Sequence, residues 1–223
     1  MLLSFKFVFL CVILTTFLIA NSDSKRVLGF FPTPSKSHLI IHGAVIEALA
    51  KQGHEITVVT SIPWKTKNSQ IRHIHLKTVP KFSLDVVTQG SDNPLPWYKK
   101  LTQFIESMSD YAENCLSDPA MQKLMKDESF DLVILGYFTN DFLLGVGAHF
   151  KCPVVLSFQV RAVGQINDFL GNPQELSYVP SLMGGGTQPM GFVDRVKNFL
   201  FVGFIEGVVL NNLINWFQAD AYR

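Results

Sequence analysis

Residues 26–60 read RVLGFFPTPSKSHLIIHGAVIEALAKQGHEITVVT, and this stretch decides the fold. It opens with an apolar run, 26–31, which is closed by two prolines and predicts a buried strand. From Ser37 onward, apolar residues recur at helical spacing until Gly53, a residue typical of the position just after a helix. The β-branched run 56–60 then predicts a second strand. A strand, a helix and a strand in this order predict a βαβ unit, in which the two strands run parallel.

The remainder of the chain repeats this alternation of strands and helices. The first helix has an expected buried face made of Leu39, Ile40, Val45, Ile46 and Leu49. Further strands are expected at 74–79, 130–135 and 153–157, and further helices at 101–115 and 140–150, with a break at Asp118-Pro119. This pattern predicts a doubly wound α/β domain with a Rossmann-like parallel sheet.

The last third of the chain has a different composition. Residues 161–191 are rich in Gly, Pro, Asn and Ser, which is typical of loops. The run 199–210 is apolar but shorter than the roughly 20 residues that a bilayer-spanning helix needs, and it contains Glu206. We expect a helix that packs on the domain or lies at a membrane surface. For the phenylalanines of 192–217 we expect core packing, with a hydrophobic cleft or lipid contact as alternatives.

The N-terminal segment has the form of a signal peptide. Lys6 precedes an apolar run, 7–20, and the following Ala20-Asn21-Ser22 offers the small residues that signal peptidase prefers. Because the run is too short for a typical bilayer span, we expect residues 1–22 to be removed and the mature chain to begin near Asp23.

Composition excludes one class of function and leaves the thiol chemistry open. The chain has 19 basic and 18 acidic side chains, and it has no cluster of Lys or Arg, so we expect no binding to nucleic acid. Cys115 and Cys152 remain in the mature chain, where they would form one disulfide or stay free. The apolar setting of Cys152, before Pro153, favours two buried free thiols.

The turn after the first strand is where chemistry is expected, because ligands of open α/β sheets bind beyond the carboxyl ends of the strands. This turn lacks the Gly-x-Gly-x-x-Gly pattern, which argues against a dinucleotide there. It places His38 at the start of the first helix. A neutral imidazole there can act as a general base, since the helix dipole disfavours its charged form. The alternative is that His38 only caps the helix or bonds within the turn.

Several segments, taken in order, resemble one known family. They are Gly29-Phe30-Phe31-Pro32, Ser37-His38, the run 49–60, Gly136-Tyr137-Phe138-Thr139-Asn140-Asp141, Ser177-Tyr178-Val179-Pro180 and the run 192–198. Their order and spacing resemble the N-terminal domain of the UDP-glucuronosyltransferase family of UDP-glycosyltransferases, in an insect-like form. The resemblance covers essentially the whole chain.

The resemblance implies that residues 23–223 form the acceptor-binding, N-terminal domain of a GT-B fold. It implies a C-terminal UDP-sugar domain and a membrane-spanning helix, both absent from this sequence. The full-length enzyme would be anchored on the lumenal side of the endoplasmic reticulum and act in detoxification. Its expected partners are a small lipophilic acceptor, the UDP-sugar, the membrane and other transferases in an oligomer.

The resemblance also implies the reaction. A hexose or glucuronic acid would pass from UDP to the hydroxyl of a small lipophilic acceptor, with inversion at the anomeric carbon. His38 matches the catalytic base of the family and would take the hydroxyl proton. The UDP-sugar is a co-substrate, and neither a cofactor nor a metal is expected.

The sequence departs from the family at the residue that orients this base. Many members have an aspartate at the end of the fourth strand, where this chain has Gly136 or Tyr137. Asp141, a little further on, is a candidate partner for His38, or only an acid in the first turn of a helix. His42 lies four residues after His38 on the same helix face, but this pair has no third ligand for zinc.

Two other interpretations remain open. A truncated acceptor domain would bind small hydrophobic molecules, or regulate full-length transferases, without catalysis. A secreted α/β hydrolase would use His38 differently, although the sequence lacks the Gly-x-Ser-x-Gly motif of such enzymes.

Overall fold

The computed structural model describes residues 24–79, 96–137, 140–159, 166–167, 170–172, 174–181 and 184–212. The expected signal peptide, 1–22, lies outside these residues. So do Phe138 and Thr139 of the family-like segment, and the last phenylalanine of 192–217.

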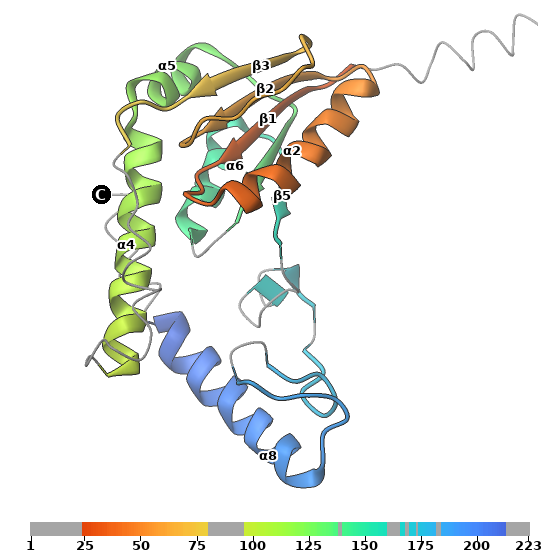
Figure 1. Ribbon diagram of the computed structural model, residues 1–223, viewed down its shortest axis with the longest axis vertical. Coiled ribbons are helices and arrows are strands. Elements are labelled where there is room, and N and C mark those ends of the chain that lie inside the picture. The colour runs from red at the N-terminus through yellow and green to blue at the C-terminus, as the bar shows by residue number, and fades with distance from the viewer. Residues whose placement is uncertain are drawn as a thin grey trace, which may run out of the picture.

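Parallel strands form one sheet at the centre of the described chain (Figure 1). In chain order they are β1 (Arg26–Phe31), β2 (Glu55–Thr60), β3 (Ile71–His75), β4 (Leu132–Gly136) and β5 (Val154–Ser157). Their spatial order is β3-β2-β1-β4-β5, so β1 is central and the chain order reverses between β1 and β4. The predicted Rossmann-like parallel sheet is confirmed.

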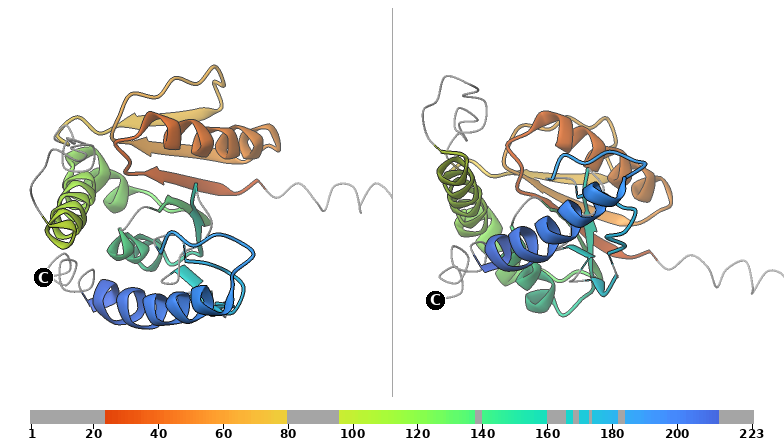
Figure 2. Two further views of the ribbon diagram at one scale, coloured as in Figure 1. Left: turned by 60° about the horizontal axis from the view of Figure 1, so that its bottom comes forward. Right: turned by 90° about the horizontal axis from the view of Figure 1, so that it is seen from below.

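Helices cover both faces of this sheet (Figure 2). They are α2 (Lys36–Lys51) on one face, and α4 (Trp97–Ser117), α5 (Pro119–Asp127) and α6 (Gly145–Phe150) on the other. Side chains of β1 alternate between the two layers, as a strand requires. Val27 and Phe31 are buried with Ile46 of α2, whereas Leu28 and Phe30 are buried with residues of α4, α5 and α6. A sheet covered on both faces explains why its strands are continuous apolar runs.

The buried face of α2 differs from the expected one. Leu39 and Ile46 are buried as predicted, but Ile40 and Val45 are exposed. Their place on the buried face is taken by His42, because residues three and four apart share one side of a helix. The helix ends where it was predicted to end, and Gly53 follows it with a φ of 90°.

The third strand was predicted too late in the chain. It spans Ile71–His75 rather than 74–79, and its last pair with β2 is Thr60 with His75. Beyond this pair, the N–H groups of Lys77 and Thr78 donate to the carboxylate of Asp118, which takes the chain off the sheet. Asp118 also begins α5, where its side chain accepts from the N–H of Ala120, so the predicted break at Asp118-Pro119 is confirmed.

The helix predicted at 140–150 begins with a tighter turn than expected. Its first part is the 3₁₀-helix η1 (Asp141–Leu144), which α6 continues to Phe150. Asn140 precedes η1 without capping it, and its side-chain amide instead donates to the carbonyl of Gly136 at 3.1 Å. This bond connects Asn140 to the end of β4.

A separate helical segment follows the loop region. α8 (Phe192–Leu200) runs directly into a π-helix, η2 (Phe201–Leu210), and both lie well away from the sheet in Figure 1. Asn198, on α8, accepts from the N–H of Ser181 and donates to the carbonyls of Leu176 and Val179. Glu206 is buried and accepts a hydrogen bond from the hydroxyl of Ser181. These bonds fasten the loop at 174–181 to the helix.

Core packing was the wrong expectation for three phenylalanines of this helix. Phe192 is 82% exposed, and Phe199 and Phe204 are 61% exposed. The helix is therefore held by its polar side, through Asn198 and Glu206, while these rings face outward. Among the described residues, no helix has both the length and the apolar character needed to cross a membrane.

Both described cysteines are free, as the interpretation from the sequence favoured. Cys115 is fully buried between α4 and the sheet, and burial raises the pKa of its thiol to about 12. Cys152 is only partly buried, so the expectation of two buried thiols holds for Cys115 alone.

Candidate active site

His38 lies in the first turn of α2, beyond the carboxyl end of β1. The turn before it is tied down at its base, where Ser61 donates to the carbonyl of Thr33 and Thr33 accepts from the N–H of Ser35. Two prolines, Pro32 and Pro34, limit the remaining backbone freedom of this turn. The structure therefore places His38 at the edge of the sheet where open α/β folds bind ligands.

The environment of His38 favours the neutral imidazole. The side chain is half-buried, and burial lowers its pKa from the ordinary value. A histidine with a lowered pKa is mostly neutral at pH 7, so one of its ring nitrogen atoms carries no proton. This is the state that a general base needs before it meets its substrate.

His42 lies one helical turn after His38 and is only 1% exposed. Its ring is stacked on Phe31, with ring centroids 4.5 Å apart and an interplanar angle of 1°. Its Nδ1 lies 2.8 Å from Oγ of Ser157, and its Nε2 lies 2.5 Å from Nε2 of Gln159. Burial, followed by the neighbouring His38, lowers the pKa of His42 to about 4. His42 is therefore a neutral, fully bonded ring inside the site.

Reasoning from the sequence considered His42 only as a zinc ligand, argued against that role, and missed this cluster. Ser157 and Gln159 lie more than 100 residues away in the chain, so only the sheet order brings them to α2. The one signal in the sequence was the four-residue spacing from His38. Within the described parts of the chain, no three His, Cys, Asp or Glu side chains are grouped so that they could hold a metal ion.

Gly136 is the last residue of β4 and lies against His42. A Cβ atom at this position would come within 2.9 Å of Nε2 of His42 and 3.1 Å of Cδ1 of Phe31. The space beside the strand end is thus filled by the imidazole from α2. The sequence showed that position 136 has no acidic residue. It did not show that the imidazole of His42 occupies the space where such a side chain would lie.

Asp141 lies in the first turn of η1, and Tyr137 donates its phenol hydrogen to the Asp141 carboxylate. Burial, and then the Asp141 carboxylate, raise the pKa of Tyr137, so its hydroxyl stays protonated and can donate. This bond connects two residues four positions apart after β4. A partnership between Asp141 and His38 remains a prediction.

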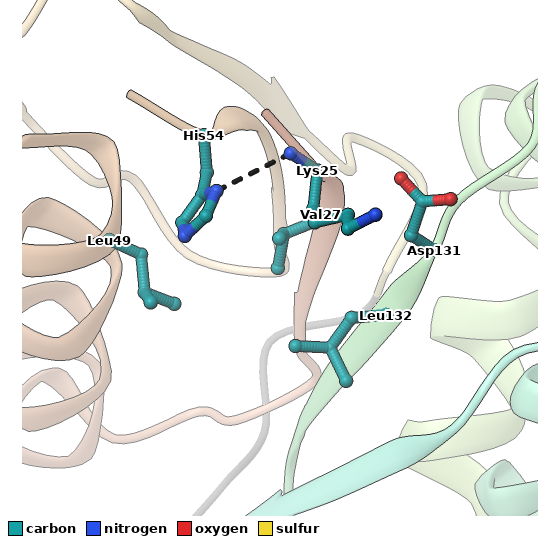
Figure 3. A pocket seen from close by; sticks show the side chains of 6 residues that line it. All are labelled: Lys25, Val27, Leu49, His54, Asp131 and Leu132. Atoms are coloured by element: carbon teal, nitrogen blue, oxygen red, sulfur yellow. Dashed lines mark hydrogen bonds between the residues drawn. The ribbon is translucent and has the colours of Figure 1, made fainter. Parts of the chain in front are cut away.

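A cavity lies at the opposite end of the sheet from His38 (Figure 3). It has a volume of about 440 Å³ and is lined by Lys25, Val27, Leu49, His54, Asp131 and Leu132. Its polar groups serve the chain itself, because His54 accepts from the N–H of Lys25 and Asp131 accepts from the N–H of Arg26. This cavity lies at the amino ends of the strands, where open α/β sheets do not usually bind ligands.

The described chain is a Rossmann-like α/β domain, as shown by the order of its parallel strands and the helices on both faces of its sheet. Its candidate site lies beyond β1, where His38 and His42 stand at the carboxyl edge of the sheet. Residues 27–219 match the family described as UDP-glucoronosyl and UDP-glucosyl transferase, and the chain belongs to this family.

Relatives with known names agree with this assignment. UDP-glucosyltransferase 2 from the insect Dactylopius coccus is 26% identical over 91% of this chain, and human UDP-glucuronosyltransferase 1A9 is 26% identical over 74%. The chain spans 41% and 33% of the lengths of these two proteins. The crystal structure of CalG4, the calicheamicin glycosyltransferase, superposes with a TM-score of 0.46 at 15% identity, covering 86% of this chain and 45% of CalG4.

Proposed function

We propose that this domain binds a small lipophilic alcohol or phenol and presents its hydroxyl to His38 for transfer of a sugar from a UDP-sugar. The observation that carries the proposal is the half-buried His38 in the first turn of α2, with its pKa lowered by burial. Family membership supports sugar transfer from UDP as the class of reaction. The name of the relative from Dactylopius coccus supports UDP-glucose as the first donor to test, and glucuronic acid is the alternative sugar.

In the proposed step, His38 takes the proton of the acceptor hydroxyl while the acceptor oxygen attacks the anomeric carbon. The bond from that carbon to the UDP oxygen breaks on the opposite face, and UDP leaves with both bonding electrons. The configuration at the anomeric carbon is therefore inverted. The domain contributes by holding the hydroxyl next to a neutral base and in line with the donor.

We propose that the donor is held by a second, C-terminal domain in a GT-B arrangement. The chain spans less than half the length of the relatives that it matches, which supports a further domain in the active enzyme. We also propose that residues 1–22 direct the protein into the endoplasmic reticulum and that the full-length form is anchored to its membrane. N-terminal sequencing of the protein from insect cells tests the signal peptide, and a start before residue 20 would contradict it.

A chimera tests the catalytic proposal directly. Residues 24–223 are fused to the C-terminal half of UDP-glucosyltransferase 2 from Dactylopius coccus, and UDP release is measured with UDP-glucose and a panel of small phenols and alcohols. We expect acceptor-dependent turnover that His38→Ala abolishes while UDP binding persists. The matched control is His54→Gln, at the other end of the sheet, which should leave turnover unchanged.

Two results would count against the proposal. Turnover that survives His38→Ala would remove His38 as the base. Tight binding of the acceptors by a chimera that never releases UDP would favour a binding domain without catalysis.

A further inference from the structure

His42 connects the helix that carries His38 to β4 and β5. Its imidazole lies against Gly136 at the end of β4 and beside Ser157 at the end of β5. Gln159, two residues beyond β5, contacts the same ring from the following loop. One buried side chain thus joins three separate parts of the sheet edge.

Both ring nitrogen atoms of His42 have a side-chain partner. Oγ of Ser157 lies 2.8 Å from Nδ1, and the side-chain amide of Gln159 lies 2.5 Å from Nε2 and 3.3 Å from Nδ1. A neutral imidazole has one donor and one acceptor nitrogen, so it can bond to a hydroxyl on one side and an amide on the other. The neutral form matches the burial of the ring and its low pKa.

His38 and His42 are neighbours on one face of α2. Residues four apart on a helix lie one above the other, and His38 contributes to lowering the pKa of His42. A ring held on both its nitrogen atoms and on its face fixes the rotation and the height of this part of the helix. The same contacts therefore set where the imidazole of His38 stands relative to β4 and β5.

Among the described residues at this edge, other side chains have partners of their own. After β4, the ionisable side chains are Tyr137 and Asp141, which bond to each other. The contacts that β1 and β5 make with His42 come from the uncharged Phe31 and Ser157. On α2 itself, Lys36 is exposed at the start of the helix.

We propose that His42 is a positioning residue for His38, and that Ser157, Gln159 and the missing side chain of Gly136 are the features that hold it in place. This inference rests on the proposed function of His38. The proposal gives His42 the role of orienting His38. An acid at position 136 could have had this role, but the chain has glycine there.

The first test replaces His42 by Phe, which keeps a ring against Phe31 but removes both hydrogen bonds. In the chimera we expect kcat to fall by about 100-fold, as for a base displaced by about 1 Å, with the KM for UDP-glucose changed by less than about twofold. The matched control is His73→Phe, because His73 also has a hydroxyl partner, Thr60, at 2.8 Å, but on the β2–β3 side of the sheet. We expect this control to leave kcat unchanged.

The second test keeps the imidazole and moves it. In Gly136→Ala the new Cβ would meet Nε2 of His42 at 2.9 Å, so the ring must shift. We expect the same loss of kcat as in His42→Phe. The double variant Gly136→Ala/His42→Ala has no ring to displace, so we expect its loss of thermal stability to be smaller than the sum of the losses of the two single variants, while kcat stays low.

A third measurement does not depend on turnover. The titration of His38 is followed by NMR of its Cε1–H in the 223-residue chain, with and without His42→Phe. We expect the pKa of His38 to rise toward the ordinary value of about 6.5 once its position is released. A folded His42→Phe variant with the original kcat and an unchanged His38 titration would overturn the proposal, as would an equal loss of kcat in His73→Phe. Turnover that survives His38→Ala is a different result, which overturns the base assignment and not the hold on α2.

Discussion

The backbone N–H and the side-chain hydroxyl of Thr78 both donate to one carboxylate oxygen of Asp118, at 3.0 and 2.6 Å. Lys77 and Ala120 add two further backbone donors to the same side chain, which is 2% exposed. Burial alone would raise the pKa of Asp118, but these hydrogen bonds outweigh it and the pKa is lowered. The carboxylate of Asp118 thus binds the backbone just after β3 and also caps the start of α5.

Replacing Asp118 by Ala should therefore destabilise the chain markedly. We expect the free energy of unfolding at pH 7 to fall by about 3 kcal/mol, because a buried cap and several charge-assisted hydrogen bonds are lost together. Urea denaturation followed by circular dichroism measures the change. Asp127→Ala, at the exposed end of the same helix, is the control and should change the stability by less than about 0.5 kcal/mol.

The effect of Asp118 should also depend on pH with a definite sign. Its pKa is lower in the folded chain than in the unfolded one, so its contribution is complete above the unfolded value of about 3.9. The contribution disappears as the pH falls through the lower, folded-state pKa. The difference between the wild type and Asp118→Ala should thus shrink in acid, and a difference that grows below pH 4 would contradict this assignment.

The pH dependence of turnover tests the state of His38. Burial lowers its pKa, so the neutral base persists below the ordinary value of about 6.5 and is lost as the pH falls through the lowered pKa. We expect the acidic limb of kcat/KM for the chimera to lie below pH 6.5, since this quantity reports the free enzyme. An acidic limb above pH 6.5 would show that the base is charged more easily than its burial allows.

Two helical glycines should respond to alanine in opposite ways. At Gly147 of α6, a Cβ would lie 2.1 Å from Cγ2 of Val154 in β5, so Gly147→Ala should cost about 1–3 kcal/mol of stability. At Gly203 of η2, a Cβ would meet no atom within 4 Å, so Gly203→Ala should be neutral or stabilise by up to about 1 kcal/mol. Thermal melts of both variants decide the matter, and equal effects would show that α6 does not pack on β5 this closely.

Removing the Asn198 side chain should release the loop at 174–181 while the sheet stays intact. Asn198→Ala leaves the carbonyls of Leu176 and Val179 and the N–H of Ser181 without these partners. The loss is on the order of 2 kcal/mol locally, so we expect chymotryptic cleavage after Tyr178 to be faster by roughly tenfold or more. Asn212→Ala, which removes one bond near the exposed end of the helix, should leave the cleavage rate unchanged.

Much of the sheet could be predicted because its strands are buried on both faces. The runs that contain β1 and β2 are apolar and bounded by Pro or Gly, which are local signals. β3 is different, since three of the five residues in its sequence Ile-Arg-His-Ile-His are polar and it lies at the edge of the sheet. Its end depends on hydrogen bonds to Asp118, some 40 residues later, and no local pattern contains that information.

The candidate site also has one part that local sequence could predict and one part that it could not. The position of His38 could be predicted because it follows a strand and starts a helix, and both are properties of neighbouring residues. The neighbours of His42 come from β4 and β5, so they depend on the reversal of strand order beside β1. The apolar pattern also suggested that Ile40 and Val45 face the core, but the sheet buries His42 instead.

The central position of β1 has a consequence for how the protein is made. Val27 in β1 pairs with Ile56 in β2 and, on its other side, with Leu132 in β4. Arg26 is likewise bonded to Asp131, 105 residues further along the chain. During synthesis, the first strand thus waits with one side open until β4 has left the ribosome, and such distant pairings form slowly. We expect the nascent chain to need protection of this open strand during that interval, and the candidate base to gain its surroundings only after β4 and β5 have been synthesised.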